Sequence, residues 1–162
     1  MDPKELAEQL DNLFARDQNF WHIPLISALK EINADEAAWR PAGWPYSIWD
    51  IVQHVMYWEA VVLGWFRGES KRPVIEREGV AHDWPAIPDP PSAEAWEAAW
   101  DALCRGHEHL IDAVNDATPE QLAAPSPGRK RSLGFFTRGL VGHTSYHCGQ
   151  IVLLKRLRSL HA

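Results

Sequence analysis

Four long segments of the chain have apolar residues at every third or fourth position, and this helical period most constrains the fold. Side chains spaced in this way share one face of an α-helix, whereas a half-buried strand alternates with a period of two. No segment of strand length shows that alternation. Capping residues and chain breakers place the predicted helices at residues 3–31, 48–67, 93–115 and 133–160.

Each predicted helix follows a side chain that can accept hydrogen bonds from its first free amides: Asp2, Ser47, Ser92 and Ser132. Asn33 and Thr118 indicate two further short helical turns, because each is followed three residues later by Glu or Gln. Pro24 lies inside the first segment, and we expect it to kink or divide that helix.

Four helices with apolar faces predict an all-α protein, an antiparallel four-helix bundle. The length of 162 residues corresponds to a single domain, residues 1–162. The connections between the helices are long, above all residues 69–91, which contain five prolines and a mixed run of charges. A simple up-down-up-down order is therefore not guaranteed.

Composition excludes several classes of function. The net charge of −6 argues against binding of nucleic acid through its phosphates, since that requires an excess of Lys and Arg. The sequence contains no run of 18 apolar residues, so we expect no membrane span. The charged N-terminus is unlike a signal peptide. Two cysteines make no disulfide framework and suit a reducing compartment, so we expect a cytoplasmic protein.

The histidines on the second and fourth predicted helices are the candidate functional residues. His143 and His147 are four residues apart, which puts both rings on one helix face, one turn apart. His54 lies on an apolar face of the second helix and can supply a third nitrogen from a neighbouring helix. The alternative is that these histidines are hydrogen-bonded core residues. His107, on the inner face of the third helix, is a reserve ligand.

Three glycines on the fourth predicted helix, Gly139, Gly142 and Gly149, lower its intrinsic stability by roughly 1 kcal/mol each. Close approach of another helix or of a ligand would compensate for this cost. We therefore expect this helix to carry either a packing surface or part of a binding site.

The chain resembles the DinB/YfiT-like family of metal-dependent proteins in three stretches. The first is AAWRPAGWPYSIWDIVQHVMYWE, which contains His54, and the second is TPEQLAAP before the last helix. The third is GHTSYHCGQI, which is similar to the family's His-x-x-x-His-x-Gly-Gln-Ile signature. Together the similarity spans about residues 1–160.

This resemblance implies a four-helix bundle that holds a divalent metal through His54, His143 and His147. Family metals include zinc and nickel, and many members are homodimers. Characterised relatives are largely transferases or isomerases that use a small thiol such as bacillithiol or mycothiol. The resemblance therefore adds a low-molecular-weight thiol and a homodimer to the expectations for this chain.

Three neutral nitrogens leave a divalent ion with an open coordination position, as in catalytic zinc sites. Such an ion lowers the pKa of a bound water or binds a thiol as thiolate. We therefore expect a metal-dependent transferase or hydrolase that acts on a small-molecule substrate. Two alternatives stay open: a non-catalytic module that binds a metal or small molecule, and a structural dimer module in which the histidines only pack.

Glu59 and Gln150 are the candidates for a catalytic role. Glu59 is five residues after His54, about 140° around the helix, so direct ligation of the same metal is not expected. It is a partner that supports a metal ligand, a remote acid or base, or one half of a buried ion pair with an arginine, either Arg40 or one from the fourth helix. Gln150 follows His147 by one turn and can orient its ring, bind substrate or join two helices. Cys148 points away from His147, and we expect a buried free thiol there.

Overall fold

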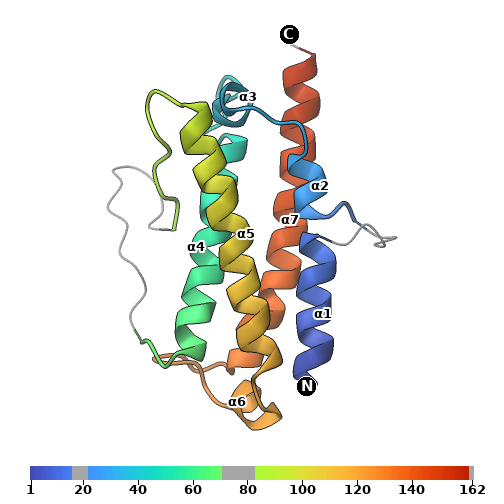
Figure 1. Ribbon diagram of the computed structural model, residues 1–162, viewed down its shortest axis with the longest axis vertical. Coiled ribbons are helices and arrows are strands. Elements are labelled where there is room, and N and C mark those ends of the chain that lie inside the picture. The colour runs from blue at the N-terminus through green and yellow to red at the C-terminus, as the bar shows by residue number, and fades with distance from the viewer. Residues whose placement is uncertain (16–21, 71–82, 161–162) are drawn as a thin grey trace.

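The computed structural model describes residues 1–15, 22–70 and 83–160, which form seven α-helices and no strand (Figure 1). The helices in chain order are α1 (Pro3–Phe14), α2 (Leu25–Leu29), α3 (Ala34–Ala38), α4 (Ile48–Phe66), α5 (Ala93–Asn115), α6 (Pro119–Ala123) and α7 (Leu133–Ser159). No helix in these described ranges is both long and apolar enough to cross a membrane.

Four helical columns make up the bundle, and α1 and α2 together form one of them (Figure 1). Helix α4 packs against α5 and α7, and α1 packs against the same two helices. The short helix α2 packs on α7, α3 packs on α4 and α5 near one end of the bundle, and α6 packs on α7 at the other end. This arrangement confirms the predicted all-α four-helix bundle.

Neighbouring helices α4 and α5 run parallel to each other. Trp49 meets Trp96 near the start of both helices, and Glu59 meets His107 further along both. Parallel neighbours require a long return of the chain, and residues 67–92, between the end of α4 and the start of α5, are available for it. The antiparallel arrangement predicted from the sequence is therefore wrong for this pair, and the bundle lacks the simple up-down-up-down order, which the sequence had left open.

The helical segment predicted at residues 3–31 forms two helices, a division that the expectation of a kink or break at Pro24 included. Helix α1 ends at Phe14, and α2 begins only after Pro24, which is its N-cap. Proline has no N–H to donate and disfavours helical backbone in the residue before it, so it starts a helix more readily than it continues one. Pro24 thus divides the predicted helix, and residues 16–21 lie outside the described part of the chain.

Helix α4, which carries His54, has a buried N-terminus that side-chain hydrogen bonds cap. Ser47 accepts from the Asp50 amide, and the Asp50 carboxylate accepts from the Ser47 amide and hydroxyl, so the two form a capping box. Arg40 adds an ion pair to the same carboxylate at 2.7 Å. Because Asp50 is 0% exposed, this pair neutralises a charge that would otherwise be costly to bury.

Two clusters of buried apolar side chains fill the bundle, one around Trp49, Leu103 and Ile151 and the other around Val62, Leu110 and Leu140. Five buried polar residues of α4, α5 and α7 lie at or near the boundary between the two clusters along these helices, and we call them the polar layer: His54, Glu59, His107, Thr144 and His147. The candidate functional histidines therefore belong to a polar layer across the middle of the bundle.

Candidate metal centre

Three histidine side chains from two helices meet in this polar layer. The Nε2 atom of His143 lies 3.0 Å from Nε2 of His54 and 3.1 Å from Nε2 of His147. One nitrogen from each residue lies within 4.8 Å of the other two, so the group could hold a metal ion. Two nitrogens bound tetrahedrally at about 2.0–2.1 Å would be about 3.3 Å apart, close to the observed spacings.

Hydrogen bonds at the outer nitrogens decide where two of these rings carry their protons. The Nδ1–H of His54 donates to the backbone carbonyl of Asp83 over 2.7 Å, since a carbonyl can only accept. The Nδ1 atom of His147 lies 2.6 Å from Oε1 of Gln150, an amide oxygen that accepts in the same way. Both neutral rings therefore present a bare Nε2 lone pair to the centre.

His143 occupies the position between these two lone pairs. Its Nδ1 atom is buried and has no hydrogen-bond partner among the described residues. A neutral imidazole carries one N–H, so Nε2 of His143 can donate to at most one of its two neighbours. The three inward nitrogens thus share no more than one proton, and a cation would satisfy the remaining lone pairs. The donor set fits a divalent metal.

Burial keeps all three rings neutral at physiological pH. The pKa of His143 is lowered to about 4, first by burial and then by the neighbouring His147 and His54. Burial also lowers the pKa of His147 to about 4, although its bond to Gln150 opposes the shift. The pKa of His54 is lowered by burial as well. Neutral imidazole is the form that binds a metal, so no proton has to be displaced near pH 7.

Asp83 and Trp84, in the connection before α5, form one wall of the site, and sequence reasoning missed both. Trp84 stacks on His54 with ring centroids 4.0 Å apart, and the Asp83 carboxylate accepts from Nε1 of Trp58 over 3.0 Å. The carboxylate also lies 3.8 Å from Nδ1 of His54. Neither residue belongs to a helix, so no periodic signal in the sequence could have placed them here.

Glu59 does not join the histidine cluster. It accepts a hydrogen bond from Nδ1 of His107 over 3.0 Å, and both side chains are buried. The interpretation as an ion pair with Arg40 is wrong, because Arg40 pairs with Asp50. His107, the reserve ligand, is hydrogen-bonded to Glu59 and stacks on Phe14 with ring centroids 3.8 Å apart. It therefore also lies outside the cluster.

Gln150 contacts the cluster directly. Besides its bond to His147, its Nε2 donates to the hydroxyl of Tyr146 over 3.0 Å, which holds the amide in place. Of its predicted roles, the structure shows the contact that orients the His147 ring. Cys148 is buried, and burial raises the pKa of its thiol to about 12, so it is an inert free thiol at neutral pH.

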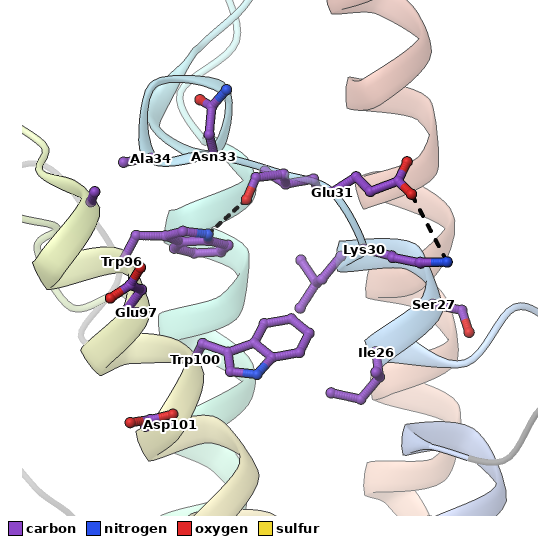
Figure 2. Close-up of a pocket in the computed structure, with 13 residues that line it drawn as sticks. Ile26, Ser27, Lys30, Glu31, Asn33, Ala34, Trp96, Glu97, Trp100 and Asp101 are labelled. Atoms are coloured by element: carbon purple, nitrogen blue, oxygen red, sulfur yellow. Dashed lines mark hydrogen bonds and ion pairs between the residues drawn. The ribbon is translucent and has the colours of Figure 1, made fainter.

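Two cavities formed by described residues lie outside the histidine cluster. A cavity of about 750 Å³ lies between α2 and α5, where Trp100 projects toward Ile26 and Trp96 donates to the Ile32 carbonyl over 2.9 Å (Figure 2). A smaller groove of about 420 Å³ lies between the loop at residues 41–44 and α7. Gln150 lines this groove, so the groove adjoins the histidine cluster.

These features define an all-α bundle whose last helix contributes two histidines, one turn apart, to a candidate metal centre completed by a neighbouring helix. The sequence model of one family, described as the DinB superfamily, matches residues 25–151. The chain belongs to the DinB superfamily, and the matched range includes all three histidines. Comparisons with curated proteins and with solved structures gave no match.

Proposed function

We propose that this chain is a metal-dependent transferase or hydrolase in which His54, His143 and His147 hold a divalent transition metal. The observation that carries the proposal is the convergence of three Nε2 atoms, two of them bare lone pairs, within a buried layer. No fourth protein ligand joins them among the described residues. A site of three neutral nitrogens is typical of catalytic rather than structural zinc.

The metal would supply a Lewis acid that lowers the pKa of a bound water or thiol into the neutral range. The chain's own residues keep the site ready for it. Gln150 and the Asp83 carbonyl hold two ring protons on the outer nitrogens, and Trp84 covers one face of His54. The Asp83 carboxylate accepts from Nε1 of Trp58, which ties the residue that carries this carbonyl to α4.

Zinc and nickel are the proposed metals, because imidazole nitrogens suit both ions. The proposed nucleophile is a low-molecular-weight thiol or water, and the substrate is a small molecule. The groove beside Gln150 is lined mainly by apolar side chains, including Trp44 and Leu153, and supports a substrate with an apolar part.

One observation favours the alternative of a non-catalytic metal-binding module. Glu59 and Gln150, the predicted catalytic candidates, are both engaged in hydrogen bonds with histidines. Glu59 in particular is separated from the cluster and bonded to His107, so it offers no base to the centre. Metal uptake without turnover would support this alternative.

The first test is the metal content of protein purified without an affinity tag. We expect on the order of one transition-metal ion per chain, lost in His147→Ala and kept in His109→Ala, which removes an exposed histidine of α5. Elemental analysis measures both variants. Equal metal content in the two variants would refute the assignment of the site.

The second test is turnover. Metal-loaded protein, assayed with thiol and electrophile pairs and with esters and amides, should show activity that disappears in His147→Ala and persists in His109→Ala. Loaded protein that turns over none of these substrates would leave the binding module as the function.

We also propose that the chain forms a homodimer through α7. Six of the exposed residues of this helix form a stripe of apolar side chains and glycines with steps of three and four: Phe135, Gly139, Gly142, Tyr146, Gly149 and Leu153. A Cβ atom built on any of the three glycines would meet nothing within 4 Å among the described residues, so the close packing expected at them is not supplied by that part of the chain. A second copy of α7 packed on this stripe would supply it.

A further inference from the structure

We propose that Asp83 and Trp84 act as a clamp on His54, fastened by Trp58, that sets the tautomer and the ring orientation of this histidine. The inference rests on the proposed metal site. Its consequence is that metal binding and the docking of the segment at residues 83–84 onto α4 stabilise each other.

The polar contact of the clamp determines the tautomer. The Asp83 carbonyl accepts from Nδ1–H of His54 over 2.7 Å, and this bond leaves Nε2 unprotonated and directed at His143. Without that acceptor, the ring could carry its proton on Nε2 and donate to His143 instead. The backbone of Asp83 therefore selects the form of His54 that can bind a cation.

The side chain of Asp83 fastens this carbonyl in position. Its Oδ2 atom accepts from Nε1–H of Trp58 over 3.0 Å, and Trp58 lies one helical turn after His54 on α4. Indole N–H is a donor only, so the bond needs an acceptor at position 83. Asp83 is thus held by two side chains of α4: its carbonyl by His54 and its carboxylate by Trp58.

The aromatic contact restrains the ring plane. Trp84 lies nearly parallel to the His54 imidazole, at 9°, with centroids 4.0 Å apart. Tyr46, next to the N-cap of α4, stacks on Trp84 with centroids 3.7 Å apart. The His54 ring is therefore held edge-on by a hydrogen bond and on one face by a stacked indole.

The coupling follows from these contacts. Asp83 lies 25 positions along the chain from Trp58 and 29 from His54, so its docking on α4 depends on tertiary contacts such as these two hydrogen bonds. A metal bound through Nε2 of His54 favours the same tautomer as the clamp. Linkage then requires that the metal stabilise the docked segment as much as the docked segment strengthens metal binding.

The test uses three variants and the dissociation constant for Zn²⁺, measured by competition with a chromogenic chelator. Asp83→Leu and Trp58→Phe should each weaken binding, by about 10–100-fold for Asp83→Leu, as is typical for partners that orient a ligand. Asp83→Asn should stay close to the original affinity, because its amide oxygen still accepts from Trp58. Asp101→Leu, an exposed carboxylate of α5, is the matched control.

The outcomes separate the clamp from the metal site itself. If His147→Ala abolishes Zn²⁺ binding while Asp83→Leu and Trp58→Phe bind normally, the site stands and the clamp is refuted. If Asp83→Asn loses as much affinity as Asp83→Leu, the charge of Asp83 matters and not its fastening, which also overturns the clamp. Circular dichroism of each variant verifies that the helices are retained.

A second readout is independent of affinity. Nitrogen-15 NMR of the metal-free protein at neutral pH should show His54 protonated at Nδ1, and Asp83→Leu should lose this preference. Hydrogen exchange at the Trp84 amide should slow when Zn²⁺ is added to the original protein. A His54 ring protonated at Nε2, or exchange at Trp84 that Zn²⁺ leaves unchanged, would refute the proposal.

Discussion

At the scale of single residues, the partner of each Nδ1 atom separates the buried histidines by role. The Nδ1 atoms of His54 and His147 face neutral acceptors, a carbonyl and an amide, so their Nε2 atoms are free to bind. Nδ1 of His107 faces the Glu59 carboxylate, and its Nε2 has no partner in the described chain and no second histidine beside it. Burial alone therefore does not identify a ligand among these residues.

The Glu59–His107 pair is expected to stabilise the fold and to leave metal binding unchanged. His107→Ala strands a buried carboxylate and should lower the free energy of unfolding by about 3–5 kcal/mol, measured by urea denaturation. The double variant Glu59→Leu/His107→Leu should recover most of this loss, because apolar side chains of similar size can replace a buried pair. A loss of metal from the folded double variant would contradict the structural role.

Acid is expected to destabilise the metal-free protein through His143 and His147. Their folded pKa values of about 4 lie below the unfolded value of 6.5, so the unfolded chain binds more protons between these limits. The free energy of unfolding should be constant above about pH 7 and fall as the pH drops from 6.5 toward 4.

The slope of this pH dependence is the measurement. His147→Asn should reduce this slope by the amount that corresponds to about one proton taken up on unfolding. Urea denaturation at a series of pH values measures the slope. His109→Asn, on the exposed side of α5, should leave the slope unchanged. Equal slopes in the original protein and in His147→Asn would show that the His147 pKa is not depressed in the folded state.

At the scale of elements, α4 depends on its N-terminal cap to present His54. Ser47 is 0% exposed, bonds both the amide and the carboxylate of Asp50, and is held next to Arg40. Helix α5 begins at an exposed cap, Ser92, that has no such carboxylate partner. The two caps therefore offer a matched comparison.

Ser47→Ala is expected to lower the free energy of unfolding by about 1–2 kcal/mol, at the upper end for an N-cap, because it also removes a hydrogen bond to a buried carboxylate. Ser92→Ala should cost less, about 0.5–1 kcal/mol. Urea denaturation with an unchanged m-value measures both. The reverse order of the two costs would contradict the role assigned to the Asp50 network.

At the scale of the whole molecule, the exposed stripe on α7 is the surface proposed to pair two chains. Phe135 is 52% exposed and Leu153 is 56% exposed, so both present apolar surface that a second chain would bury. Phe135→Asp should shift the protein toward monomer in size-exclusion chromatography with light scattering. Ile23→Asp, which replaces an apolar residue of similar exposure outside α7, should not. A monomeric original protein would refute the dimer.

Much of the architecture could be read from local signals. The predicted helix at residues 93–115 matches α5, and the helix predicted at 48–67 ends one residue earlier as α4. The apolar period alone overstated the first helix, because the segment at residues 3–31 forms two helices, Pro3–Phe14 and Leu25–Leu29, and Pro24 was the local signal of this division. Periodicity reports which face a side chain occupies, and it does not report whether the backbone is continuous.

By itself, the sequence determined that the chain is helical, where three of its long helices lie, and which three histidines share inward faces, because period and capping are properties of neighbouring residues. Only the tertiary structure decided that α4 and α5 run parallel, that Glu59 pairs with His107, and that Asp83 and Trp84 meet His54. These contacts join residues far apart in the chain. Their formation depends on how the helices pack and on where an irregular connection returns, and no local pattern encodes either.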